Sequence, residues 1–394
     1  MPNMTDYLLW RGDVTFREKE LNEVDSLILC TLCYLPWEDL VPSTDSAEGL
    51  PFITAAGKFV SSGRAPLGAI DPRPLLRPCA LSARFSSALA GDFVNRVNRQ
   101  NGMQFCAMTF RLDDGSLFAA FRGTDSTLTG WREDFSLSYS ETTPAQEAAV
   151  RYLELIAAKY PGPISLGGHS KGGNLALYAA SFCRGSVRAR IGAVYSCDGP
   201  GLNEKTVCLP GFVPLGDRFR LIIPEESVVG VMMNDGEERK VVKSSAKGFQ
   251  QHDPMTWQVL GPSFEEAGGQ TGNSVFVDRT FRRWLGDMSE QEREGLTTLL
   301  FDGMEATGAN TMGEAKAQGL NAAGAMVKNF IAMDGSRQKD VLEAVGKLLR
   351  AGGGQLADGA RKGVDGLMGI IGLNNNPGAD RKKPGDPPPD GNKT

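Results

Sequence analysis

Hydrophobic positions in the middle of the chain alternate between strand-like and helix-like patterns. Thr143, Pro144 and Gln146 open a predicted helix that runs to Tyr160, because they combine a proline in the first turn with the spacing of a capping box. Short apolar runs that predict strands lie near residues 163–167, 191–197 and 218–223. Strands that recur between helical or loop segments predict an α/β fold, with a mostly parallel sheet and helices on both faces.

The region before residue 122 shows a less regular pattern. Apolar residues with helical spacing predict one helix at 21–35 and another from Gly91 to Gln100. Between them, a Pro/Gly-rich loop is expected from about residue 41 to 78, and so long a loop is expected to cover an active site. Two apolar runs, 103–112 and 117–121, flank an Asp-Asp-Gly-Ser turn and predict a hairpin.

The character of the chain changes beyond about residue 275. Amphipathic patterns predict helices at 281–300 and 337–349. The apolar run at 364–373 is too short to cross a bilayer, which needs about 20 residues. We expect it to dock on the domain, and the neighbouring Arg361 and Lys362 offer peripheral membrane contact as the alternative.

These patterns divide the chain into four expected parts. Residues 1–78 form an N-terminal lead-in helix and lid loop, and residues 79–275 form the α/β core. Residues 276–373 form a helical C-terminal extension. Residues 374–394 lack apolar periodicity and are rich in Asn, Pro and charge, which predicts a disordered tail.

Composition narrows the function classes. The net charge of -5 over 394 residues leaves no basic stripe for nucleic acid. Seven scattered cysteines fit reduced thiols, and the N-terminal residues lack a secretory signal, so a cytoplasmic protein is expected. Cys30 and Cys33 lie in an apolar helical pattern without a second pair or a nearby His, which favours core packing. No metal or cofactor is implied, and the oligomeric state is left open.

Ser170 is the candidate nucleophile. It lies between Gly168 and Gly172, after an apolar strand-like run and before a helix-forming segment. A sharp strand-to-helix turn of this kind lifts a serine hydroxyl above the sheet edge, and the small flanking residues allow strand and helix to approach closely. The alternative is a plain strand-to-helix turn.

The chain has two histidines, and a catalytic serine needs one of them as its base. His169 stands beside the serine in the turn, where its side chain is expected to point away from the hydroxyl. His252 follows the last predicted strand, where the base of this arrangement belongs, and is the predicted general base. The alternative is a surface loop histidine.

The third member of a triad is a carboxylate that orients the imidazole. Asp198 follows the apolar run at 191–197 and is favoured, whereas Glu226 follows the next predicted strand and is the main alternative. Glu225 and Asp253 are minor candidates. The competing explanations are a turn-forming Asp198 and a solvated Glu226.

A tetrahedral intermediate also needs hydrogen-bond donors for its oxyanion. The amide of Lys171, directly after the nucleophile, is one predicted donor, and the amide of Thr124, after the run at 117–121, is the other. A strand-ending turn with Thr124 as a helix cap is the alternative.

Several of these segments resemble the class 3, fungal-type triacylglycerol lipases. The resemblance covers about residues 80–260 and rests on Phe121–Thr124, Trp131, Asp134-Phe135, Gly168–Ala176 and His252 with Trp257. It implies an α/β-hydrolase fold, with Thr124 in the oxyanion hole and Ser170 as nucleophile. Over residues 1–260 the chain is more similar to an uncharacterised, mainly bacterial lipase-like family, through Asp6–Asp13, Ser170–Asn174, Asp198–Gly201 and Ser227–Gly230.

The chain departs from the lipase pattern beside the nucleophile, where Lys171 replaces the usual Leu. The expected function is hydrolysis of an acyl ester through an acyl-enzyme, and the resemblance implies a lipid-like or other small-molecule acyl substrate. A catalytically silent hydrolase scaffold and an amidase or peptidase with the same triad are the alternatives.

Overall fold

The computed structural model describes residues 1–351 except 47, 67, 235–237, 273–274, 276–282 and 284–285. One eight-stranded sheet follows chain order, with antiparallel pairing up to β4 and parallel pairing from β4 to β8. Its strands are β1 (Leu50–Pro51), β2 (Leu89–Asn98), β3 (Met103–Arg111), β4 (Leu117–Phe121), β5 (Ile164–His169), β6 (Ile191–Cys197), β7 (Phe219–Pro224) and β8 (Arg239–Val242), and β9 (Val259–Leu260) and β10 (Ser263–Phe264) form a separate ribbon. The α/β fold, the hairpin and the three strands expected near 163–223 are confirmed.

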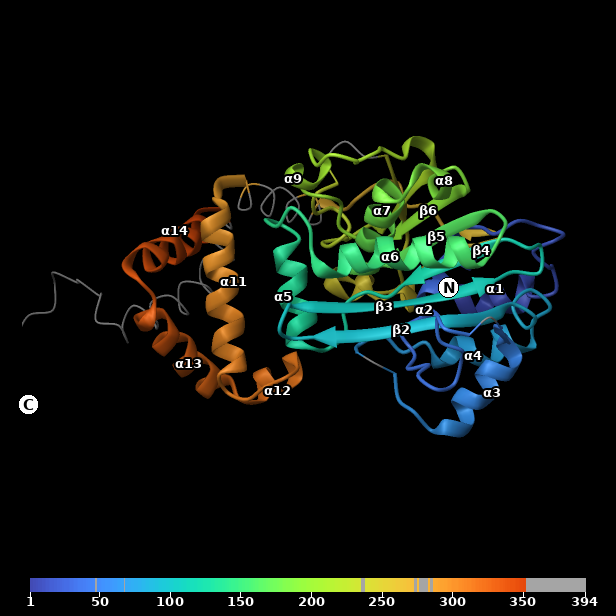
Figure 1. The fold of residues 1–394 in the computed structure, drawn as a ribbon, viewed down its shortest axis with the longest axis horizontal. Coiled ribbons are helices and arrows are strands. Elements are labelled where there is room, and N and C mark those ends of the chain that lie inside the picture. Colours follow the sequence, from blue (N-terminus) through green and yellow to red (C-terminus); the bar gives the residue numbers. More distant parts are fainter. Residues whose placement is uncertain are drawn as a thin grey trace, which may run out of the picture.

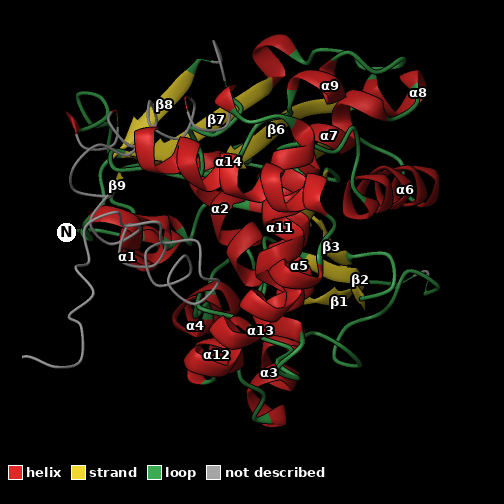
Figure 2. Ribbon diagram, turned by 90° about the vertical axis from the view of Figure 1, so that its left-hand side faces the viewer, coloured by secondary structure: helices red, strands yellow, loops and turns green. Residues whose placement is uncertain are grey.

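Helices cover both faces of this sheet (Figures 1 and 2). They are α1 (Met4–Arg11), α2 (Glu23–Leu32), α3 (Phe52–Ser62), α4 (Arg73–Leu81), α5 (Leu128–Ser136), α6 (Pro144–Lys159), α7 (Lys171–Phe182), α8 (Gly185–Arg188), α9 (Glu204–Val207), α11 (Glu290–Glu305), α12 (Met312–Ala317), α13 (Gly319–Ala332) and α14 (Gly335–Ala351). Thr143 caps α6 with Gln146 in a capping box, as its sequence predicts.

Strand β4 shows how the sheet joins two hydrophobic cores. Side chains alternate along a strand, so Phe118 and Ala120 face the layer of α1 to α4, whereas Leu117, Ala119 and Phe121 face α6 and α7. All five residues are buried. The N-terminal helices therefore complete one core of the sheet and are not a separate layer of surface structure.

The helix predicted from Gly91 to Gln100 is wrong, because these residues belong mainly to β2. Val94 to Asn98 pair with β3, and the register shifts between Gly91 and Val94, where Asp92 has a positive φ of 53°. This bulge breaks the alternation of apolar residues, so the sequence pattern resembles that of a helix.

The Pro/Gly-rich segment expected as a loop from 41 to 78 instead contains β1, α3 and most of α4. Phe52 and Phe59 of α3 pack on Trp37, with ring centroids 6.1 Å and 5.3 Å from the indole. Proline in the first turn of α4 is compatible with a helix start. The prolines that indicated a loop therefore stand at a helix start and inside a short, tertiary-packed helix.

The C-terminal helices stand at one end of the sheet, against α5 (Figure 1). Phe301 of α11 contacts Phe135 of α5 with ring centroids 5.5 Å apart, and Arg132 pairs with Asp302. The backbone continues the contact, because the amide of Leu128 donates to the carbonyl of Asn310 at 2.9 Å. Helix α11 is thus fixed directly to the helix that follows β4.

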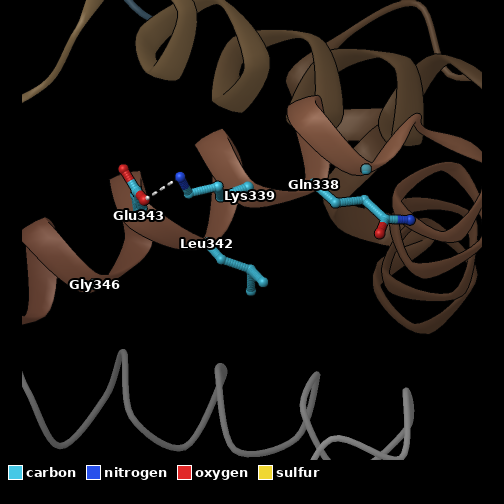
Figure 3. Close-up of a pocket in the computed structure, with 6 residues that line it drawn as sticks. Gln338, Lys339, Leu342, Glu343 and Gly346 are labelled. Atoms are coloured by element: carbon cyan, nitrogen blue, oxygen red, sulfur yellow. Dashed lines mark ion pairs between the residues drawn. The ribbon is translucent and has the colours of Figure 1, made fainter.

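Helices α13 and α14 pack on α11, and Figure 3 shows one face of α14. Leu342 lies there beside a Lys339–Glu343 ion pair of 3.6 Å. Ser289 caps α11, which confirms the helix predicted at 281–300 over residues 290–300, whereas residues 281–282 and 284–285 lie outside the described residues. The expected segments at 364–373 and 374–394 lie outside the described residues. Among the described helices, none has the length and apolarity needed to span a bilayer.

A buried ion pair links three N-terminal segments. Arg84 and Asp25 are both fully buried, with the guanidinium Nη2 2.5 Å from the carboxylate. Arg84 also donates to four backbone carbonyls, those of Val14, Thr15, Lys19 and Glu20. The Arg84 side chain therefore supplies hydrogen-bond donors for the carbonyl groups of a loop that forms few backbone–backbone hydrogen bonds.

We expect Arg84→Met to lower the free energy of unfolding by about 3–5 kcal/mol, because it leaves the Asp25 carboxylate buried without its cation. Arg77→Ala, at an exposed site on α4, is the control and should change it by less than about 0.5 kcal/mol. Urea unfolding followed by far-UV circular dichroism measures both. Equal effects in the two variants would contradict this role for the pair.

Candidate functional site

Ser170 lies at the turn between β5 and α7 with φ 58° and ψ -134°. This backbone conformation is strained for a residue with a side chain. The turn is also tight, because a Cβ at Gly168 would lie 2.0 Å from the carbonyl carbon of Gly172, and a Cβ at Gly172 would lie 2.1 Å from the carbonyl oxygen of Phe121. Glycine at both positions is therefore required by close backbone approach.

The segment after β4 passes directly beside this serine. A Cβ atom at Gly123 would lie 2.9 Å from the Cβ of Ser170. The backbone amides of Thr124 and Lys171 both lie next to this contact in the chain, and neither donates to an acceptor among the described residues. Thr124 does not cap α5, because Thr127 does. Two unpaired amides beside a strained serine are what an oxyanion needs.

The side chain of Lys171 points away from the solvent into a polar cluster. Its Nζ donates to Glu133 Oε2 at 3.0 Å and to the side-chain and main-chain oxygens of Gln104 at 2.6 and 3.0 Å. Glu133 in turn accepts from the amides of Gln104 and Ala145. The cation beside Ser170 therefore connects α7 to α5 and β3.

Asp134, the next residue of α5, lines the site. Its Oδ2 accepts the hydroxyl proton of Thr124 at 2.5 Å, and Lys171 Nζ lies 3.7 Å from Oδ1. Burial raises the pKa of Asp134 to about 6, against the lowering effects of Lys171 and of the Thr124 hydrogen bond. The Thr124 hydroxyl is thus engaged as a donor to Asp134, and its amide is the donor left for a ligand.

His252 lies against Asp198. The imidazole Nδ1 is 2.6 Å from Asp198 Oδ2, and Asp198 Oδ1 accepts from the Ser227 hydroxyl at 2.5 Å and from the Gly230 amide at 3.0 Å. Burial alone would raise the pKa of Asp198, but hydrogen bonds from His252 and Ser227 outweigh it and hold the pKa below its usual value. Asp198 is therefore an ionised carboxylate positioned to orient the ring.

The other candidate carboxylates have different partners. Glu226 accepts from the amide of Gly248 and from the side chain of Gln251, so it anchors the segment that carries His252. Asp253 accepts from the amide of Met255 and caps a short turn. Glu225 pairs through its backbone with Val242. Of the four candidates from the sequence, the structure brings Asp198 onto the imidazole.

His169 is fully buried and lines the same cavity as Ser170, and its ring contacts that of His252 with centroids 4.6 Å apart. Its Nδ1 lies 3.0 Å from the Tyr34 hydroxyl, and its Nε2 lies 2.8 Å from the carbonyl oxygen of His252. Burial, together with the neighbouring His252, lowers the pKa of His169 to about 3, so the ring is neutral at pH 7. Because a carbonyl can only accept, Nε2 carries the proton and Tyr34 donates to Nδ1.

Ser170 and His252 line one cavity of about 340 Å³. Thr124, Lys171 and Asp134 contribute to its polar end. The rest of the wall is mainly apolar and comes from several separate segments, with Ile70, Trp131, Met232 and Leu296 as representatives. Leu296 belongs to α11, so the C-terminal helices form part of the wall.

Sequence reasoning missed five features of this site: Tyr34, Glu133, the contact of Asp134 with Thr124, Gln104 and the wall from α11. Only Asp134 carried a signal, since the sequence analysis had already singled out the Asp134-Phe135 segment. In the described part of the chain, no cluster of three or more His, Cys, Asp or Glu side chains is placed to hold a metal ion.

Comparisons with known proteins assign the chain to a family. A search of curated proteins found no match. Among solved structures, a native propeptide complex of Rhizomucor miehei lipase matches with a TM-score of 0.33 and 16% identity, covering 64% of this chain and 76% of the lipase chain. A family model described as Mbeg1-like matches residues 79–302, more than half of the chain. The chain belongs to the Mbeg1-like family.

Proposed function

We propose that the protein is a serine hydrolase of the α/β-hydrolase fold that cleaves acyl esters. One observation carries the proposal: Ser170, on a strained turn, and His252, held by Asp198, line the same mainly apolar cavity. Two unpaired backbone amides lie beside the serine. A structural turn has no need for this combination of groups.

In the proposed reaction, the hydroxyl oxygen of Ser170 attacks the ester carbonyl while His252 Nε2 takes its proton. Asp198 holds the imidazole through Nδ1 and stabilises the imidazolium that forms. The amides of Thr124 and Lys171 stabilise the negative oxygen of the tetrahedral intermediate. His252 then protonates the leaving alcohol, and water attacks the acyl-enzyme through the same groups.

The cavity supports an apolar acyl group as the part of the substrate that is recognised. At about 340 Å³ it lies at the small end of ligand pockets, and its wall offers few polar partners away from the serine. The resemblance to class 3 lipases points in the same direction. We therefore include a lipid-like or other small acyl ester with a short or medium acyl chain in the proposal.

The proposal also includes a cytoplasmic location. All seven cysteines are free thiols, and Cys208 is the exposed one, which is in keeping with a reducing compartment. The silent scaffold and the amidase are outcomes of the experiments below. A scaffold would leave the parent protein unlabelled, whereas an amidase would cleave an amide as readily as the matched ester.

A fluorophosphonate probe should label the native protein stoichiometrically and leave Ser170→Ala unlabelled, because only an activated serine attacks the phosphorus. Ser138→Ala is the matched control, since Ser138 lines the same cavity but does not lie on the strained turn. In-gel fluorescence and intact mass measure the labelling. A native protein that stays unlabelled would support the scaffold.

Asp198→Asn should lower kcat for an activated acyl ester by about 10⁴-fold, because the wrong imidazole tautomer is then held at His252. Glu226→Gln should lower it by less than about tenfold, since Glu226 supports the loop backbone. Steady-state hydrolysis of matched esters measures both. A larger loss in Glu226→Gln would make Glu226 the acid.

The Asp198→Asn variant also tests the lowered pKa of Asp198. A group with a depressed folded pKa contributes stability above its unfolded pKa of 3.8 and loses that contribution as the pH falls through the folded value. The difference in free energy of unfolding between the parent and Asp198→Asn should therefore be full at pH 6 and shrink below pH 4. Urea unfolding across this range measures it, and a constant difference would contradict the shift.

His169→Phe should lower kcat by about 10- to 100-fold and leave KM within about twofold, because His252 loses the donor on its carbonyl and shifts relative to Ser170. Tyr34→Phe removes the hydroxyl that binds His169 Nδ1, and it should lower kcat by a smaller factor than His169→Phe. Ester hydrolysis and a thermal melt measure each variant. A parallel rise in KM would assign His169 to the pocket shape instead.

A further inference from the structure

Helices α5 and α11 lie side by side and run in opposite directions (Figure 1). At one end of the pair, the guanidinium of Arg293 donates to the carbonyl of Ser138, just beyond α5. At the other end, the amide of Leu128 donates to the carbonyl of Asn310 at 2.9 Å. The first two turns of α11 therefore lie beside the C-terminal end of α5.

The wall of the cavity that contains Ser170 follows α5 toward this contact. Asp134 accepts the Thr124 hydroxyl, so it lies at the end of the cavity that holds the proposed oxyanion donors. Leu137 and Ser138 line the same cavity one helical turn further along the chain, a distance of about 5 Å. The cavity therefore extends from the oxyanion segment to the segment that α11 contacts.

Helix α11 contributes Arg293, Leu296 and Thr297 to this end of the cavity. Residues three and four apart share one face of a helix, so a single face of α11 forms the wall. The Thr297 hydroxyl donates to the carbonyl of Arg293, and the Ser138 hydroxyl donates to the carbonyl of Phe135, both at 2.8 Å. Because both hydroxyls are engaged, the partly buried Leu296 supplies aliphatic surface for a ligand to contact.

Other faces of α11 are held by the C-terminal helices. Leu299 packs with Phe330 of α13 and Val341 of α14, and all three side chains are buried. Glu292 pairs with Lys347 of α14 at 2.7 Å. Helix α11 is thus packed on two sides, and a ligand that presses on its cavity face must displace a packed element.

We propose that Leu296 of α11 closes the acyl compartment and limits the length of the chain that the site accepts. The inference rests on the proposed function. Each methylene that enters an apolar cavity buries further surface and raises the affinity about fourfold. The gain ends where the chain meets Leu296, because a longer chain overpacks the wall.

Binding of linear carboxylic acids, from butanoic to tetradecanoic acid, tests the proposal. These acids represent the acyl product, and they bind without any reaction at Ser170. Calorimetric titration of the full chain should give an affinity that rises about fourfold per methylene and stops rising at one chain length. We call this length the break, and it is the quantity to compare between variants.

Leu296→Ala should move the break about two carbons toward longer acids, because it removes most of the side chain that ends the compartment. Leu296→Phe should move it about two carbons toward shorter acids, because the ring occupies part of the compartment. Esters of the same chain lengths should show the same order in kcat/KM. If the break moves with the acids while no ester is cleaved, the proposed hydrolysis fails and the assignment of Leu296 stands.

Leu300→Ala is the matched control. Leu300 also lies on α11 and is partly buried, but it packs with Leu128 and Phe301 and does not line the cavity. The variant should lower the melting temperature about as much as Leu296→Ala and leave the break where the parent has it. A thermal melt beside the titration therefore separates a loosened helix from a lost wall.

The proposal is overturned if no acid binds, if both Leu296 variants keep the break of the parent, or if Leu300→Ala moves it equally. Dicarboxylic acids provide a further check, because Arg293 also lines this end of the cavity. Tighter binding of a dicarboxylic acid than of the monocarboxylic acid of the same length would assign the end of the compartment to Arg293 and overturn the assignment of Leu296.

Discussion

The arrangement of the site depends on a buried ion pair between Lys171 and Glu133. Lys171 begins α7 directly after the candidate nucleophile, and Glu133 lies in α5, so the pair connects the two elements that flank the serine. Both side chains are almost fully buried, and Gln104 of β3 completes the cluster. Removal of either partner would leave an uncompensated charge in the interior, which is why such pairs tolerate little variation.

This pair accounts for the lysine directly after the serine, because its ammonium compensates the buried Glu133 carboxylate. The backbone of Lys171 directly follows Ser170, while its side chain binds Glu133 of α5, and the next residue of α5, Asp134, accepts from the Thr124 hydroxyl. The geometry of both proposed oxyanion donors thus depends on one side chain. A leucine would pack at this position but would leave Glu133 buried without a cation.

The sequence predicts the elements whose signals are local. Turn residues, capping boxes and apolar runs place the hairpin, α6 and the parallel strands, and the glycines around Ser170 indicate the turn. Two segments were predicted wrongly from the sequence. The bulge at Asp92 breaks the strand alternation of β2, and the prolines in α4 indicate a loop although the segment is a short helix stabilised by tertiary packing. The contributions of Tyr34 and α11 arise from contacts across more than a hundred residues, for which a single sequence has no signal.

The choice between Asp198 and Glu226 also depends on tertiary contacts that a single sequence does not reveal. The two residues follow adjacent parallel strands, β6 and β7, so both lie at the same edge of the sheet. Only the position of the loop that carries His252 decides which carboxylate reaches the imidazole. That loop is held by His169, Glu226 and Trp257, none of which is adjacent to Asp198 along the chain.

The hydrophobic core beneath the sheet includes residues from Met4 to Phe264. This extent determines where the chain can be truncated for expression. The region of family similarity, 79–302, starts inside α4 and stops inside α11. Expression of that region alone would expose the underside of the sheet, split two helices and remove Tyr34 from beside His169. Boundaries of sequence similarity are therefore not boundaries of autonomous folding in this protein, and truncation should follow the packed core instead.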